Sequence, residues 1–336
     1  MCRVRQFYRE PEAVFWTYVF PLIMIVGLGI AFRNRPAERI AVDVVKSDGS
    51  ADAMAALSPP VADGFDVEVR RRIDCRERLR LGKTSIVVDV TDEGYVYRYD
   101  PTRPESVSAR ARVDDALQRA AGRTDPVAAS DHLVMEPGSR YIDFLVPGLL
   151  GMNLMGGGLW GIGYVTVDMR VRKLLKRLVA SPMRRSDFLL SLVGGRLIFT
   201  VPEVAVVLGA GVLLFDIMIT GRVASVMAVA LLGACSFSGI GLLVACRARR
   251  LETVTGLMNV IMLPMWLLSG IFFSYERFPA WLHPFIKALP LTQLNDALRA
   301  VILEGESLPS QWFALLYLTV MGTGCFCLAL RWFRWN

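Results

Sequence analysis

One short motif in the sequence is typical of phosphate binding, but it lacks the rest of the loop that such binding requires. Gly82-Lys83-Thr84 matches the last three residues of a phosphate-binding loop. That loop needs another glycine five residues before Gly82, and Glu77 stands there. A glycine that ends a helix is the better account of Gly82. The sequence therefore predicts no nucleotide site on this chain.

Residues that bind metals or act as catalysts are too few or poorly spaced. The only histidines are His132 and His283, and Cys325-x-Cys327 is not a spacing typical of a metal site. The sequence contains neither Gly-x-Ser-x-Gly nor His-Glu-x-x-His. We therefore predict no catalytic residue, no metal ligand and no cofactor on this chain, which would then not be an enzyme.

Two charged residues lie in the otherwise apolar stretch 188–215. Arg196 and Glu203 are seven residues apart, so both project from nearly the same face of a helix, about 10 Å apart along its axis. Charges within a membrane are costly and face the interior of a bundle or water. The two side chains therefore either line a substrate path or tie helices together, with Arg196 extending toward the inner interface in the second case.

The basic segment 168–187 contains an amphipathic pattern. Its apolar residues recur at i, i+3, i+4, i+7 and i+8, which is one face of a helix, and Pro182 ends the pattern. We predict a helix over residues 169–182 that either lies on anionic lipid or inserts its apolar face into a groove of a partner. The apolar face holds Val171, Leu174, Leu175, Leu178 and Val179, and the basic side holds Arg172, Lys173, Lys176 and Arg177.

Membrane-spanning helices must position these residues. Of the 336 residues, 54% are hydrophobic, and they gather in long blocks. A helix needs roughly 20 apolar residues to cross a bilayer. The blocks are too continuous for the strands of a barrel, the other structure that satisfies its backbone in lipid. The six transmembrane helices that we expect cover residues 14–32, 144–167, 188–215, 223–246, 253–275 and 312–330.

Basic residues in the short flanking segments predict the orientation. If the N-terminus lies inside, the inner segments hold 15 Lys and Arg residues and the short outer loops hold 4. This bias predicts a multi-pass protein of the cell (inner) membrane with both termini in the cytoplasm. The bias also accounts for most of the net charge of +7, so we expect contact with membrane lipid and none with nucleic acid.

Residues 33–143, between the first two spans, predict a folded extracytoplasmic domain. The segment is nearly balanced, with 18 basic and 20 acidic residues. Its patterns predict the order β, α, β, α, β, β, α, typical of a small α/β domain. That domain either contacts a partner or substrate or serves as a structural cap. Its expected elements are strands Ile40–Val45, Phe65–Val69, Thr84–Val90 and Tyr95–Tyr99 and helices Asp74–Leu81 and Pro104–Ala121.

The expected fold class is therefore an all-α polytopic membrane protein with six transmembrane helices and a small α/β extracytoplasmic domain. The domain is inserted between the first and second helices, and residues 144–336 form the membrane domain with the other five. Residues 278–290 are apolar but carry three prolines, which predicts short helices and not a further span.

Two motifs in this layout resemble those of a known family. Leu174–Met183 reads Leu-Leu-Lys-Arg-Leu-Val-Ala-Ser-Pro-Met and resembles the cytoplasmic coupling segment of type-2 ABC exporter permeases. Leu289–Arg299 resembles that family's Pro-Leu-Thr…Ala-Leu-Arg segment before the last span. The layout of the chain is similar to the subgroup with a large outer domain after the first span. Many members carry a Glu and a Gly just before the coupling helix, where this chain has Asp168 and Val171, so its ATPase contact would differ in detail.

The resemblance implies the permease subunit of an exporter of a drug, lipid, polysaccharide or similar substrate. ATP and Mg would bind to a separate cytoplasmic ABC ATPase, and a second permease subunit, identical or related, would complete the pair. Residues 1–13 would form an interfacial elbow helix. The ATPase would push on the helix 169–182, through Val171, Arg172, Lys173, Leu174, Leu175, Lys176, Arg177, Leu178, Ser181 and Pro182.

Two other interpretations fit the sequence less well. A secondary transporter or channel without an ATPase would carry several buried ionisable residues or paired broken helices, and only the third span carries charges. A membrane-anchored sensor or assembly factor acting through its outer domain would need a cytoplasmic output domain. The longest inner segment, 168–187, has only twenty residues.

Overall fold

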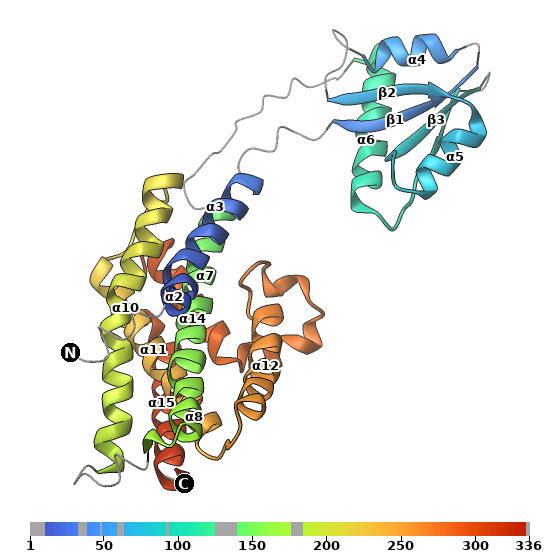
Figure 1. Cartoon of the computed structure of the whole chain (residues 1–336). Helices are drawn as coiled ribbons and strands as arrows, with labels where there is room; N and C mark the ends of the chain where they lie inside the picture. Colours follow the sequence, from blue (N-terminus) through green and yellow to red (C-terminus); the bar gives the residue numbers. More distant parts are fainter. Residues whose placement is uncertain are drawn as a thin grey trace. The chain divides into compact units, whose positions relative to one another are not determined.

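The structure is a computed structural model of the chain, which divides into two compact units (Figure 1). Met1–Arg33 and Val134–Asn336 form the helical unit, and Asn34–Leu133 form the sheet unit. Most of the predicted elbow helix, residues 1–10, lies outside the described residues. The residues that the structure describes are 11–32, 39–47, 49–58, 64–91, 94–124, 140–175 and 184–333.

The helical unit consists of long apolar helices. In the described part of the chain, five helices are long and apolar enough to cross a membrane, and a sixth apolar helix, Phe15–Ala31, is shorter. The molecule is therefore a multi-pass membrane protein, and its sixth span stays a prediction, as does the side on which each terminus lies. The five long helices are Tyr141–Val171, Ser186–Phe215, Val223–Ala245, Leu251–Leu268 and Leu308–Trp332.

Two of these apolar helices contain π-helical segments, in which the backbone winds more widely than in an α-helix. The first apolar helix passes through η1 (Phe15–Val19), and the second through η2 (Leu159–Tyr164). Asn153 Nδ2 donates to the carbonyl of Thr17 within η1, at 2.9 Å, and so joins these two helices.

The elements of the helical unit, in chain order, are α2 (Pro11–Val14), η1, α3 (Phe20–Phe32), α7 (Tyr141–Gly158), η2, α8 (Val165–Val171), α10 (Arg185–Phe215), α11 (Val223–Ala245), α12 (Leu251–Leu268), η3 (Tyr275–Arg277), η4 (Ala280–Leu282), α13 (His283–Lys287), α14 (Pro290–Ile302), η5 (Leu308–Gln311) and α15 (Trp312–Trp332).

The fifth predicted span is shorter than expected. The sequence predicts a helix over 253–275, whereas α12 ends at Leu268. Pro264 lies just before its last turn and cannot donate a backbone hydrogen bond, and Gly270, two residues past the end, adopts a left-handed φ of 67° that favours glycine. The proline-rich stretch after it forms the short helices η3, η4 and α13, as its composition predicted.

Helix α11 is the centre of the bundle, and glycines bring its neighbours close. It packs against α7, η2, α10, α14 and α15. A Cβ on Gly158 of α7 would lie 2.6 Å from the backbone carbon of Phe237 in α11, and a Cβ on Gly239 would lie 2.4 Å from the carbonyl oxygen of Gly322 in α15. Such contacts require a residue without a side chain, because the helix backbones touch directly. These glycines are therefore used for packing within the chain.

The sheet unit contains a four-stranded sheet in the order β2-β1-β3-β4. Strand β1 pairs in parallel with β2 and β3, and β3 pairs antiparallel with β4. The elements follow the predicted order, although the helix expected from Asp74 begins two residues earlier, after an Arg71 cap. Their bounds are β1 (Ile40–Val45), α4 (Ser50–Ala56), β2 (Phe65–Arg70), α5 (Arg72–Arg80), β3 (Ile86–Thr91), β4 (Gly94–Arg98) and α6 (Pro104–Ala120).

The two faces of this sheet differ in character. Helices α4 and α6 cover one face and bury a purely apolar core that includes Val42, Val44 and Val88 of the sheet. On the other face, α5 covers a smaller apolar group centred on Cys75. Strand alternation places Asp43, which is 1% exposed, on this second face. The α5 face is therefore held together largely by charged side chains.

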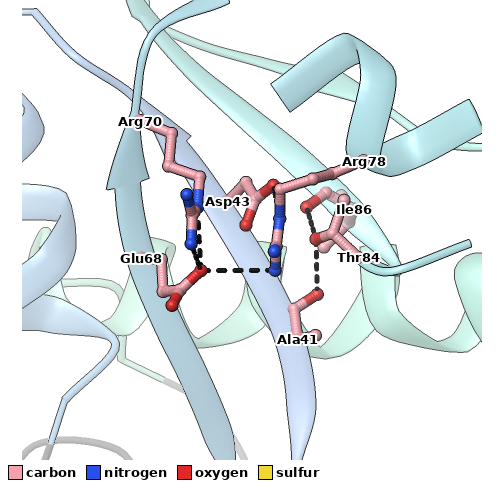
Figure 2. Close-up of polar contacts among 7 residues, drawn as sticks. All are labelled: Ala41, Asp43, Glu68, Arg70, Arg78, Thr84 and Ile86. Atoms are coloured by element: carbon pink, nitrogen blue, oxygen red, sulfur yellow. Dashed lines mark hydrogen bonds and ion pairs between the residues drawn. The ribbon is translucent and has the colours of Figure 1, made fainter. Parts of the chain in front are cut away.

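Arg78 of α5 is the centre of that charged group (Figure 2). Its Nε donates to Asp43 Oδ2 at 3.0 Å, and its Nη2 lies 3.2 Å from Glu68 Oε2. Arg70 also contacts Glu68, at 2.7 Å. Burial raises the pKa of Asp43 above its ordinary value, and the nearby Arg78 opposes this rise. Arg78 thus compensates a carboxylate that the sheet has removed from water.

We expect the Gly158→Ala variant to destabilise the helical unit. The added methyl group would overlap the α11 backbone, which cannot rotate away, so the cost is about 1–3 kcal/mol or more. Gly156→Ala is the matched control, because nothing lies within 4 Å of the Cβ position at Gly156. Thermal unfolding of the detergent-purified chain measures both. Equal midpoints for the two variants would contradict the close packing of α7 and α11.

We expect the Arg78→Ala variant to loosen the sheet unit, because it leaves the Asp43 carboxylate buried without its partner, at a cost of about 1–3 kcal/mol. Arg76→Ala removes an exposed arginine from the same helix and should have little effect. Hydrogen exchange of peptides covering 40–45, measured by mass spectrometry on the full chain, should rise only for Arg78→Ala. Unchanged exchange would mean that α5 does not depend on this ion pair.

Candidate functional site

The predicted coupling segment is described as far as Leu175. Helix α8 continues the second long helix through Val171, so the prediction of one separate helix from residue 169 is wrong at its start. Lys173 then adopts a left-handed φ of 57°, which non-glycine residues seldom do, so a turn separates α8 from Leu174 and Leu175. The other predicted contact residues lie outside the described part: Lys176, Arg177, Leu178, Ser181 and Pro182.

This turn divides the predicted apolar face. Val171 is 44% exposed and Leu174 is 37% exposed, whereas Leu175 is 1% exposed. Arg172 is exposed and pairs with Asp168 one turn earlier, at 2.9 Å, and Lys173 is exposed as well. Val171 and Leu174 are therefore available for contact outside this chain, and Leu175 is not.

Leu175 belongs to a buried cluster that joins the ends of several helices. We call this group the Leu175 cluster. It connects the predicted coupling segment with the beginning of α10, the end of α11 and the end of α15. Its fully buried members are Ile162, Leu175, Phe188, Leu189, Leu192, Leu242, Ala329 and Phe333.

Arg170, which the sequence analysis did not single out, makes the most extensive polar contacts at this end of the bundle. Its Nη1 donates to the carbonyls of Ala245 at 2.8 Å and Ala248 at 2.5 Å, and its Nη2 donates to Cys246 at 3.2 Å. Its guanidinium also stacks on the Phe333 ring, 5.4 Å from the centroid. The sequence counts Arg170 only as one of several basic residues after a span, and nothing in its spacing distinguishes a buried arginine from an exposed one.

Arg196 and Glu203 form a buried ion pair within α10. Arg196 Nη1 lies 2.5 Å from Glu203 Oε2, and the two side chains are 7% and 0% exposed. The predicted proximity on one helix face is therefore observed. The contact lies within one helix, not between helices, and Arg196 extends toward Glu203 instead of toward an interface.

The second long helix makes room for this pair. A Cβ on Gly157 of α7 would lie 2.0 Å from Arg196 Nη2, so any larger residue there would require the guanidinium to shift. Among the described residues, Arg196 Nε and Nη2 and Glu203 Oε1 have no hydrogen-bond partner. Each side chain therefore makes one hydrogen bond to the other. The remaining polar atoms of the two groups are buried without a partner among the described residues.

The motif at Leu289–Arg299 forms α14, which holds the end of α12. Asn295 Nδ2 donates to the carbonyl of Ser269 at 3.0 Å, and Arg299 donates to the carbonyl of Gly270. The Arg299 guanidinium also lies 3.7 Å from the centroid of the Phe144 ring in α7. The motif itself is visible in the sequence. The carbonyls to which it donates need a partner only because α12 ends early, and the sequence did not predict that end.

Metal binding has no candidate in the part of the chain that the structure describes, because no three His, Cys, Asp or Glu side chains come together there. The prediction of a chain without its own cofactor stays a prediction.

Comparison with known proteins agrees with this architecture. Residues 108–303, more than half of the chain, match the model of the family described as ABC-2 type transporter. The probable multidrug ABC transporter permease YbhR of Escherichia coli is 25% identical over 185 residues, which are 55% of this chain and 50% of that protein.

A second relative, ABC transporter G family member 20 of Dictyostelium discoideum, is 28% identical over 186 residues, 54% of this chain and 25% of that protein. The matches thus cover half or less of the relatives' lengths. Because the family model matches more than half of the chain, and the apolar helices agree with it, the chain belongs to the ABC-2 type transporter family and is a membrane component of an ABC transporter.

Proposed function

We propose that this chain is the permease subunit of an ATP-driven exporter, coupled to a separate cytoplasmic ATPase through the segment that begins at Val171. The observation that carries the proposal is the turn at Lys173. It presents apolar Val171 and Leu174 beside cationic Arg172 and Lys173 at the end of a long helix. Protein–protein interfaces typically combine an apolar centre with a polar rim, and apolar and charged side chains lie side by side at this turn.

The proposal assigns ATP and Mg to that partner, together with hydrolysis. The chain contributes the path across the membrane, and a second permease subunit, identical or related, completes it. The family match supports this arrangement, and the name of the Escherichia coli relative supports a drug-like molecule within the wider class of drug, lipid, polysaccharide or similar substrates.

The proposal places the Lys173 turn, with both termini, on the cytoplasmic side and the sheet unit on the outer side. The excess of Lys and Arg in the segments at the Lys173 end supports this direction. The same end of the bundle carries the exposed cations Arg247, Arg249 and Arg250 between α11 and α12.

Arg196 and Glu203 serve in this proposal as a tie within α10 and not as a substrate path. Each side chain has its opposite charge as a partner at 2.5 Å, and both are buried. A group that receives substrate must be accessible at some stage, whereas a tie must keep its partner. The pairing also weighs against a secondary transporter, which needs ionisable groups that exchange ions with the solution.

We expect charge reversal at the turn to separate the permease from its ATPase. Lys173→Glu with Lys176→Glu would place acidic groups where the partner meets basic ones, so the ATPase should no longer co-purify with the tagged chain, while membrane insertion persists. Arg76→Glu with Lys83→Glu, a change of equal charge in the sheet unit, is the control. Retention of the ATPase by the Lys173/Lys176 variant would refute this docking site.

We expect the buried pair to behave as a unit in a double-mutant cycle. Glu203→Leu or Arg196→Met alone leaves one buried charge unpaired, at a cost of about 3–5 kcal/mol, whereas the double variant Arg196→Met/Glu203→Leu should recover most of the stability. Thermal unfolding midpoints test this expectation. Export by the double variant then decides the role: normal export fits a tie, and lost export from a stable protein fits a substrate path.

A further inference from the structure

Arg170 caps a helix to which it does not belong. The last carbonyl groups of an α-helix have no partner within the helix and carry a negative partial charge. Arg170 lies in the last turn of α8, yet its guanidinium donates to the carbonyl of Ala245, the last residue of α11, and to the carbonyls of Cys246 and Ala248 in the segment that follows. A planar guanidinium with five donors fits this task, and an ammonium group cannot reach three carbonyls in the same way.

The same guanidinium connects α8 with two further helices. It stacks on Phe333, which is 1% exposed and ends α15. Phe333 in turn packs against Phe188 at the beginning of α10, with ring centroids 6.2 Å apart. One buried side chain therefore contacts the ends of α11 and α15 directly and that of α10 through one ring.

The turn at Lys173 lies between two anchors. Arg170 precedes it by three residues and is fixed by polar contacts, and Leu175 follows it by two and is buried in the Leu175 cluster. The exposed residues Val171, Arg172 and Leu174 lie between these anchors. A displacement of the exposed residues therefore moves two anchors that contact the ends of α11 and α15 and the beginning of α10.

We propose that Arg170 is the positioning residue that transmits displacement of the coupling segment to α11 and α15. This inference rests on the proposed function, because it presumes that an ATPase moves the segment. Arg170 is only 9% exposed, so it is not part of the docking surface itself. Docking and transmission are thereby assigned to different residues that are adjacent in the sequence.

The test compares the complex of wild-type chain and ATPase, purified from its own cells through a tag on this chain, with the Arg170→Met and Arg170→Lys complexes. Mg-ATP with orthovanadate is the probe that closes the ATPase, and hydrogen exchange by mass spectrometry is the measurement. In the wild type, we expect the probe to change exchange in peptides covering 172–184 and in those covering 242–250 and 326–333.

In Arg170→Met, we expect the ATPase to remain bound and the change at 172–184 to persist, while the changes at 242–250 and 326–333 are lost. Arg170→Lys keeps the charge without the fork and should retain only part of the distant response. Arg140→Gln, at the other end of the same long helix, removes an arginine paired with buried Asp143 at 2.9 Å. It should lower the unfolding midpoint and leave the response complete, which separates transmission from mere stability.

If the probe changes hydrogen exchange at 242–250 in Arg170→Met as much as it does in the wild type, the inference is overturned. If Arg170→Met does not fold, Arg170→Lys decides, and an undiminished distant response in that variant overturns the inference equally. A wild-type chain that retains no ATPase refutes the proposed function first, and the inference falls with it. A complex in which only the variants lose the distant response supports both.

Discussion

The structure depends on one constraint: backbone groups that are buried at helix ends, away from water, must find hydrogen-bond partners within the protein. Three helix ends in the described part of the bundle are satisfied by side chains from other elements. Arg170 donates to the end of α11, Arg299 and Asn295 donate where α12 ends, and Thr220 donates to the carbonyls of Ile302 and Leu303 at the end of α14. Each of these contacts also fixes one element against another, so capping and tertiary structure are the same interactions.

The same constraint explains why α12 can be short. Where the helix stops at Leu268, the carbonyls of Ser269 and Gly270 would be left without donors, and the polar side of α14 supplies them. These hydrogen bonds from α14 require its neighbours to pack closely against it. Gly151 gives Asn295 room, since a Cβ there would lie 1.9 Å from Asn295 Oδ1. Glycine on one helix and a donor on the next thus form a matched pair.

Much of the architecture could be predicted from sequence because it follows from apolar length and from alternation. The strands of the sheet unit and four of the long helices lie within a few residues of their predicted bounds. The errors arise where a residue acts through a neighbour distant in sequence. Nothing local shows that Arg170 is buried or that Lys173 makes a left-handed turn, whereas the spacing of Arg196 and Glu203 did place both on one face of a helix. The predicted end of α12 is wrong because apolar residues continue past Leu268, where the helix ends two residues before the left-handed Gly270.

The insertion point of the sheet unit has an evolutionary consequence. The chain leaves the bundle after α3 and returns at α7, and these two helices pack against each other. The bundle's own contacts therefore do not require any particular length or fold in the residues between them. Descendants of such a gene can enlarge, exchange or lose the inserted domain while the helices keep their packing, so the specialisation of relatives can diverge at this position without a redesign of the membrane part.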